Sequence, residues 1–149
     1  MTKRLSYLIL HQMRYVTNFC HNQAEDILYL PKDTCLISIN NEHEAEWNLK
    51  VKGENVLLLK FSDVRAVTPH KNVVYKPMST EDAIKIIGFL EKNKEKNILV
   101  NCAAGIARSG AIALFIHLCY GHCLKPNFWQ LSQPNPFVLG LLITEFYRK

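Results

Sequence analysis

The stretch Asn97–Gly110, NILVNCAAGIARSG, decides how the rest of this sequence is interpreted. It contains a short apolar run, a segment of small residues that opens at Cys102, and the start of a second apolar run at Ser109. Small residues let backbone N–H groups turn into a loop, and the N-terminus of a helix adds the positive end of its dipole. The stretch therefore predicts a strand, an anion-binding loop and a helix.

The residue types in this loop suit a phosphoryl group held above a sulfur atom. A thiol at a strand end, beneath backbone amides and a helix N-terminus, readily forms the nucleophilic thiolate. Arg108 offers a planar fork for two phosphate oxygens, and Ser109 places a hydroxyl close to the sulfur. We therefore expect Cys102, Arg108 and Ser109 to be catalytic. The expected phosphate-binding residues are Ala103, Ala104, Gly105, Ile106, Ala107 and Arg108.

The bulk properties of the chain fit one globular domain, 1–149. A composition of 48% hydrophobic and 21% charged residues argues against disorder. The net charge of +5 favours anionic partners but is too scattered to indicate nucleic acid alone. Five irregularly spaced cysteines form no disulfide framework, and no apolar run is long enough to span a membrane. With no signal-peptide pattern at the N-terminus, we expect a cytoplasmic protein.

Apolar runs and turn signals outline the other elements. Ser79, with Asp82 three residues later, has the spacing of a capping box, whereas residues 11–22 show no clear pattern. Residues 62–76 lack a period and contain Pro69, so they predict a long surface loop. Residues 124–136 predict a connection. Strands are predicted at 5–10, 34–39, 56–61 and 98–100, and helices at 24–30, 79–93, 109–120 and after Asn135-Pro136.

The alternation of strands and helices predicts the fold class. Continuous apolar strands followed by helices are typical of a three-layer α/β domain with a mainly parallel central sheet. Ligands of such sheets bind beyond the C-terminal ends of the strands. The expected position of Cys102 is at such an end.

Residues 101–110 resemble the signature of the protein tyrosine phosphatase superfamily, His-Cys-x5-Arg-Ser/Thr, in its small dual-specificity-like branch. Cys102, Gly105, Arg108 and the Ser109-Gly110 pair match this signature. The order of strand, loop and helix extends the resemblance over residues 34–120. The resemblance implies a cysteine-dependent phosphatase fold and a phosphocysteine intermediate formed on Cys102. The departure is Asn101, where the family has a histidine that orders the loop.

The resemblance also implies a general acid, an aspartate on a separate mobile loop upstream of the cysteine. Asp63 follows the predicted strand at 56–61 and lies 39 positions before Cys102 (102 − 63). We therefore expect Asp63 to be catalytic. Glu81 and Asp82 compete for this role, but capping explains both residues in the first turn of a helix.

These expectations describe a phosphoric monoester hydrolase acting on phosphotyrosine proteins, with phosphoserine and phosphothreonine as further candidates. The uncharged loop ranks phosphoinositides lower, and RNA 5′-phosphates are another substrate class. No cofactor and no metal is expected, because the histidines show no metal-ligand spacing. Two alternatives stay open: a catalytically weak phosphate-binding pseudophosphatase, suggested by Asn101, and a rhodanese-like sulfurtransferase. The Arg108-Ser109 pair and Asp63 argue against the sulfurtransferase, and the oligomeric state is left open.

Overall fold

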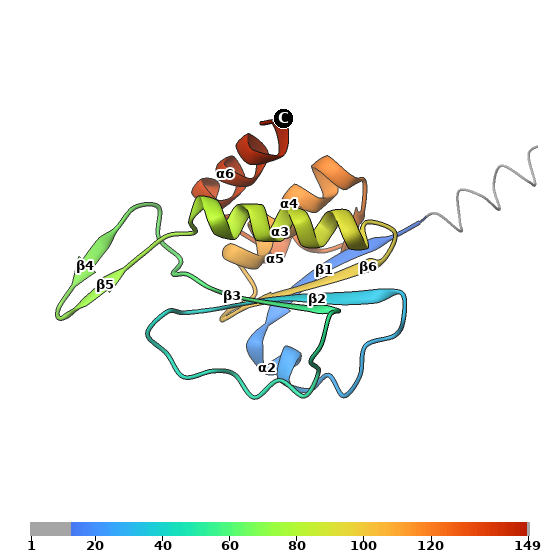
Figure 1. The fold of residues 1–149 in the computed structure, drawn as a ribbon, viewed down its shortest axis with the longest axis horizontal. Helices are drawn as coiled ribbons and strands as arrows, with labels where there is room; N and C mark the ends of the chain where they lie inside the picture. Colours follow the sequence, from blue (N-terminus) through green and yellow to red (C-terminus); the bar gives the residue numbers. More distant parts are fainter. Residues whose placement is uncertain (1–12, 149) are drawn as a thin grey trace, which may run out of the picture.

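A five-stranded sheet forms the centre of the computed structural model, which describes residues 13–148 (Figure 1). The strand order is β3-β2-β6-β1-β7, and every neighbouring pair is parallel. The predicted strand at 5–10 lies outside the described residues. The strands of the sheet are β1 (Tyr15–Cys20), β2 (Thr34–Asn40), β3 (Val56–Lys60), β6 (Asn97–Cys102) and β7 (Cys123–Leu124).

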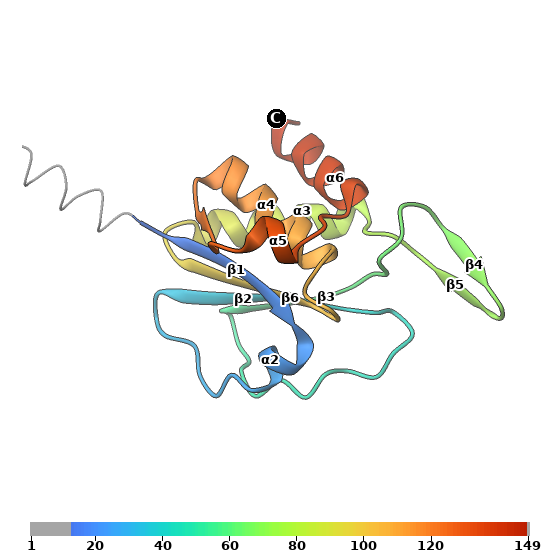
Figure 2. The ribbon, with the colours of Figure 1, turned by 180° about the vertical axis from the view of Figure 1, so that it is seen from behind.

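Helices cover the two faces of this sheet unequally (Figures 1 and 2). The short helix α2 (His21–Glu25) and the segment 41–55 lie on the face opposite to the other helices. The predicted α/β class with a mainly parallel central sheet is therefore confirmed, with one thick and one thin outer layer. The thick layer contains α3 (Thr80–Asn93), α4 (Arg108–Tyr120), α5 (Phe128–Leu131) and α6 (Pro136–Tyr147).

The helix α4 lies in the middle of the fold, as its apolar sequence predicts. All of its residues from Arg108 to Ile116 are buried, and it ends at Gly121 in the left-handed conformation (φ 80°). Phe115 packs edge-on against Phe146 of α6, with ring centroids 5.8 Å apart. Packing on all sides fixes the N-terminus of α4, where the candidate site begins.

The predicted capping box of α3 is confirmed. Ser79 Oγ accepts a hydrogen bond from Asp82 N at 3.1 Å, and the Asp82 carboxylate accepts one from Ser79 N at 3.0 Å. The cap therefore uses the carboxylate of Asp82 and one of the free N–H groups at the helix start.

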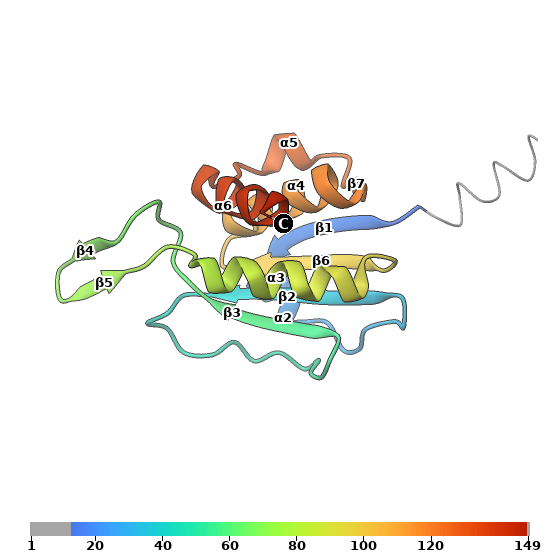
Figure 3. The same ribbon diagram turned by 45° about the horizontal axis from the view of Figure 1, so that its top comes forward.

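The short strands and helices of the structure are the ones that the sequence did not predict correctly. The predicted loop at 62–76 contains the antiparallel hairpin β4 (Thr68–His70) and β5 (Val73–Tyr75), which projects from the body of the molecule (Figures 1 and 3). A helix was predicted at 24–30, but the structure has the shorter helix α2 at His21–Glu25. Residues 15–20, for which no element was predicted, form β1. The predicted connection at 124–136 contains α5. These elements are too short to show a hydrophobic period, so tertiary contacts decide them.

Candidate active site

The loop 103–107 joins the end of β6 to the start of α4. Several of its backbone carbonyls accept hydrogen bonds from residues outside the loop, and we call these surrounding donors the frame of the loop. The first part of the frame comes from β1 and α2. Ala103 O accepts from His21 N at 3.2 Å and lies 3.0 Å from His21 Nδ1. Gly105 O accepts from Asn18 Nδ2 at 3.0 Å. These contacts hold the first half of the loop against the end of the neighbouring strand.

The second part of the frame comes from the segment before α6. Ile106 O accepts from Gln133 N at 3.1 Å, and Ala107 O accepts from Asn135 N at 3.0 Å. A trans peptide unit holds its N–H opposite its C=O. The four framed carbonyls therefore turn the N–H groups of residues 104, 106, 107 and 108 toward the inside of the loop. Converging N–H groups of this kind make an anion-binding concavity.

Gly105 is required in this loop for two reasons. Its φ is 75°, which glycine adopts without the penalty that other residues incur. A Cβ at this position would also lie 2.4 Å from the carbonyl carbon of Phe19 in β1. The loop therefore crosses the end of β1 at a distance that no side chain allows.

Cys102 lies beneath the loop, almost fully buried at 2% exposure. Its thiol donates to Ser109 Oγ at 3.1 Å, and Ser109 is itself fully buried at the start of α4. Once the sulfur is deprotonated, the same hydroxyl can donate to it, because a serine hydroxyl both donates and accepts. The predicted pairing of these two residues is thus present in the structure.

The guanidinium of Arg108 is held by two neutral oxygens. Nη1 donates to Asn41 Oδ1 at 2.7 Å and to Phe61 O at 2.8 Å. Within residues 13–148, Nε is buried without a hydrogen-bond partner, and no ion pair includes this arginine. A buried charge without a counter-ion is costly, so an anion bound next to Arg108 in the cavity that it borders would offset this cost.

Asp63 borders the same cavity as Cys102 and Arg108. This cavity has a volume of about 270 Å³, and Ala103, Ala104, Ile106, Ala107 and Gln133 complete its lining. Asp63 Oδ1 accepts from Asn135 Nδ2 at 2.8 Å. The structure therefore brings Asp63 to the predicted phosphate site, whereas the predicted site residues Ser109 and Gly105 are not among the residues that line the cavity. Glu81 and Asp82 do not border this cavity.

The segment 41–43 contacts both Arg108 and the hairpin that follows Asp63. Asn41 binds Arg108, His43 Nε2 lies 2.8 Å from Val74 O, and Glu42 Oε1 accepts from Lys76 N at 3.0 Å. The hairpin returns to its base through a hydrogen bond from Ser62 N to Lys76 O at 2.8 Å. One short segment thus links Arg108 to the loop that carries Asp63.

Asn101 is fully buried beside Cys102, and within the described residues neither atom of its side-chain amide has a hydrogen-bond partner. Burying an unpaired amide costs free energy that an apolar side chain of similar size does not cost. We predict that Asn101→Leu raises the free energy of unfolding by about 1–2 kcal/mol. Chemical denaturation of the parent and the variant measures this difference. A loss of stability would show that the amide is satisfied in the folded protein.

Sequence reasoning missed the residues that hold the loop and the arginine from outside. Asn18 is 1% exposed inside β1, a strand that the sequence did not predict, so its burial became visible only in the structure. Asn135-Pro136 predicted the start of the last helix, and Asn135 is the N-cap of α6, but nothing in the sequence indicated its contact with the loop. The other members carry no local pattern, because they lie far from the motif in the sequence. The missed residues are Asn18, His21, Asn41, Gln133 and Asn135.

Two cysteines outside the candidate site, Cys35 and Cys119, have thiols whose pKa is raised by burial. Burial raises the pKa of the Cys35 thiol to about 12. Cys35 therefore stays a protonated core thiol at neutral pH. In the part of the chain that the structure describes, no group of three or more His, Cys, Asp or Glu side chains is placed to hold a metal. No helix there is long and apolar enough to cross a membrane.

No family model and no curated protein matches this chain. Among solved structures, it is similar to the human tyrosine phosphatase-like serine/threonine/tyrosine-interacting protein, with 16% identity and a TM-score of 0.45. That alignment covers 98% of this chain and 84% of the other. The chain is also similar to Tk-PTP in its active form, with 16% identity, a TM-score of 0.47, and coverage of 91% and 93%.

Proposed function

We propose that this protein is a cysteine-dependent phosphatase that hydrolyses phosphate monoesters of the protein-tyrosine type. The observation that carries this proposal is the single cavity bordered by Cys102, Arg108 and Asp63. The framed carbonyls above it turn four N–H groups inward, and the buried Nε of Arg108 has no partner in residues 13–148. A tetrahedral dianion satisfies all of these donors at once.

In the first step of the proposed reaction, the Cys102 thiolate attacks phosphorus. The S–P bond forms as the P–O bond to the leaving group breaks, and the protonated Asp63 carboxyl gives its proton to the leaving oxygen. The loop N–H groups and Arg108 bind the equatorial oxygens, where charge is spread in the transition state. Phosphocysteine and an alcohol or phenol are the products.

In the second step, water attacks the phosphocysteine. The Asp63 carboxylate accepts a proton from this water, the S–P bond breaks, and inorganic phosphate is released. Ser109 stabilises the departing thiolate by donating its hydroxyl hydrogen. Both steps balance without a metal or a redox cofactor, and the thiolate requires a reducing compartment such as the cytoplasm.

The proposed substrate is a phosphorylated protein, with phosphotyrosine preferred. The lining of the cavity contains one cation, Arg108, and one acid, Asp63, and its other residues are uncharged. One phosphoryl group fits this balance better than a headgroup that carries several. Hydrolysis of para-nitrophenyl phosphate and of a phosphotyrosine peptide by the purified protein tests the proposal. Absence of turnover on both substrates would overturn it.

The role proposed for Asp63 predicts a variant whose defect depends on the leaving group. Asp63→Asn should lower turnover of a phosphotyrosine peptide by about 10²-fold, because the phenolate then leaves without a proton. The loss should be smaller for para-nitrophenyl phosphate, whose leaving group is a weaker base. Steady-state kinetics on both substrates measures this difference.

Asp82→Asn is the matched control for that experiment. Its carboxylate caps α3 and does not border the cavity, so this variant should lose stability but keep the parent's turnover. Equal turnover by Asp63→Asn and the parent on both substrates would remove Asp63 as the acid.

A second candidate function is phosphate binding without turnover. The buried, unpartnered amide of Asn101 favours it, because this side chain gives no hydrogen bond that would order the loop within the described residues. In this case the parent and Cys102→Ser would bind a phosphotyrosine peptide with equal affinity, and neither would hydrolyse it.

A further inference from the structure

Strand β3 forms one edge of the central sheet, next to β2 (Figure 3). Hydrogen bonds beyond its two ends fix which backbone groups face β2. Asn55 O accepts from Leu36 N at 2.9 Å, and Phe61 N donates to Asn40 O at 3.1 Å. Because backbone orientation alternates along a strand, odd-numbered residues of β3 face β2. The N–H and C=O of Leu58 therefore point outward, and its side chain is 58% exposed.

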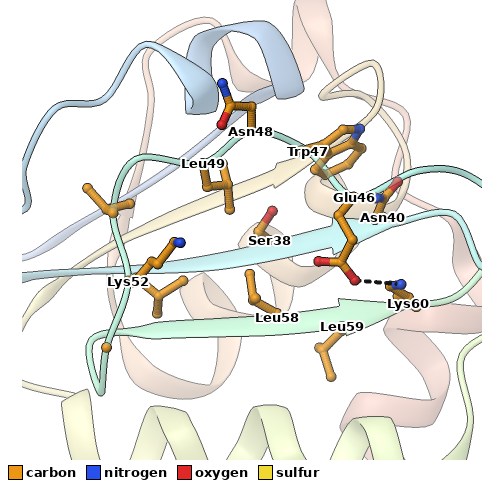
Figure 4. Close-up of a pocket in the computed structure, with 13 residues that line it drawn as sticks. Ser38, Asn40, Glu46, Trp47, Asn48, Leu49, Lys52, Leu58, Leu59 and Lys60 are labelled. Atoms are coloured by element: carbon orange, nitrogen blue, oxygen red, sulfur yellow. Dashed lines mark ion pairs between the residues drawn. The ribbon is translucent and has the colours of Figure 1, made fainter.

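A first cavity, of about 690 Å³, lies on the face of β3 that is opposite to α3 (Figure 4). The segment 41–55 covers it, and its apolar lining includes Trp47, Leu49, Val51, Val56 and Leu58. Leu59 borders it near the end of the strand. At the same end, the ion pair of Lys60 with Glu46 at 2.7 Å neutralises both charges. Polar residues also line this cavity, namely Ser38, Asn40, Asn48 and Lys52. Val56 and Leu58 come from β3 itself, so the part of the cavity next to the strand favours an apolar side chain.

A second cavity, of about 550 Å³, lies between β3 and α3. Leu57 and Phe89 contribute apolar surface to it, and Gly88 leaves open space, since a Cβ there would meet no atom within 4 Å. Its charged lining consists of Lys85, Lys92 and Lys96 against one acid, Glu54. This cavity therefore favours an acidic side chain.

We propose that the outer edge of β3 is a docking site for an extended segment of a partner protein, which adds a sixth strand to the sheet. The outward N–H and C=O of Leu58 supply main-chain hydrogen bonds, and the cavities receive alternate side chains. Successive residues of a strand point to opposite faces, so the segment carries acidic residues alternating with apolar ones. Its acidic residues lie toward the lysines of α3, and its apolar residues lie beside Trp47 and Leu58.

The position of β3 connects this surface with the proposed phosphatase site. β3 and β6 are separated by β2, so the docked strand lies three strand spacings, or about 15 Å, from β6. In either direction, one end of a docked segment reaches the edge of the sheet where Cys102 lies. A phosphorylated residue a few positions beyond that end is then delivered to the cavity. This consequence rests on the proposed function, whereas docking itself does not.

A binding experiment tests the proposal without any measurement of turnover. The probe is a fluorescent seven-residue peptide of alternating glutamate and valine, and the control peptide has the same composition in two blocks. Fluorescence anisotropy should show saturable binding of the alternating peptide, at least about tenfold tighter than that of the block peptide. Cys102→Ser should bind the probe as the parent does, so failure of docking is distinguishable from failure of the phosphatase.

Two variants of the protein separate the contributions of backbone and charge. Leu58→Pro removes an outward N–H while leaving the β2 pairing intact, and should weaken binding of the alternating peptide by about tenfold. Leu58→Ala keeps that N–H and is its matched control, with a loss of about threefold or less. The double variant Lys85→Glu, Lys92→Glu should weaken binding of the alternating peptide by about tenfold. Salt should lower the affinity of the parent for this peptide but raise the affinity of the double variant, because the attraction between charges has become a repulsion. Circular dichroism checks that each variant folds.

Three results would overturn the proposal. The first is equal affinity for the alternating and block peptides, and the second is an alternating-peptide affinity that neither Leu58→Pro nor the double lysine variant changes. The third is a dimer in sedimentation velocity that Leu58→Pro dissociates, which would assign the edge of β3 to a second copy of this chain.

Discussion

Cys102→Ser should abolish turnover while leaving phosphate binding intact. A serine hydroxyl is not ionised near neutral pH, so the nucleophile is lost and turnover should fall by about 10³-fold or more, or about 4 kcal/mol of barrier. The loop N–H groups and Arg108 do not depend on the sulfur for their position. Inorganic phosphate should therefore raise the melting temperature of the variant and the parent equally. Hydrolysis of para-nitrophenyl phosphate and thermal unfolding with phosphate measure the two effects.

Cys123→Ser is the matched control for the cysteine variant. Cys123 is half-buried in β7 at the far edge of the sheet, so turnover should stay at the parent's level. Parent-like turnover by Cys102→Ser would contradict the covalent mechanism. Loss of the phosphate-induced stabilisation in the same variant would contradict the separation of binding from chemistry.

Gly105→Ala should damage both the stability and the activity of the protein. The new Cβ would lie 2.4 Å from the carbonyl carbon of Phe19, and a backbone atom cannot swing aside as a flexible side chain does. The left-handed φ of 75° adds a penalty of about 1–2 kcal/mol. We expect a total loss of about 3 kcal/mol or more in the free energy of unfolding. Displacement of the loop should lower turnover by about 10²-fold.

Gly140→Ala is the control for that substitution. Gly140 lies within α6, and a Cβ there would meet no atom within 4 Å. Replacing a helical glycine by alanine should raise the free energy of unfolding by about 1 kcal/mol. Denaturation of both variants and kinetics on para-nitrophenyl phosphate complete the comparison. If Gly105→Ala kept the parent's stability, the close approach of the loop to β1 would be wrong.

The parts of the site that follow one another in the sequence could be predicted, and the parts that meet only in space could not. Cys102, Arg108 and Ser109 belong to one strand-loop-helix unit, whose residue types indicate its chemistry locally. The exception is Asp63, which the family resemblance and its place after the predicted strand at 56–61 suggested and which the structure brings to the cavity. The frame of the loop depends on the partners of individual carbonyls, which no local pattern encodes.

The same distinction between local pattern and contacts in space explains which helices and strands were predicted wrongly from the sequence. β2, β3 and β6 contain the predicted apolar runs at 34–39, 56–61 and 98–100, although β3 lies at the edge of the sheet and only Leu59 of its residues is buried. β1 was missed because Asn18 interrupts its apolar sequence in order to bind the loop and Ser132. The strands β4 and β5 have three residues each and include Pro69, which leaves no period to detect.

The loop 103–107 is held by residues from distant parts of the chain, so we expect its affinity for phosphate to depend on how much of the chain has folded. Two of its donors, Asn18 and His21, lie near the start of the described chain, and the other two, Gln133 and Asn135, lie near its end. A growing chain that stops before Gln133 therefore has the whole signature motif but half of the frame. Phosphate at ten times its dissociation constant would stabilise the finished protein by about 1.4 kcal/mol. We expect a smaller stabilisation of the truncated chain, because it lacks the donors that hold Ile106 O and Ala107 O.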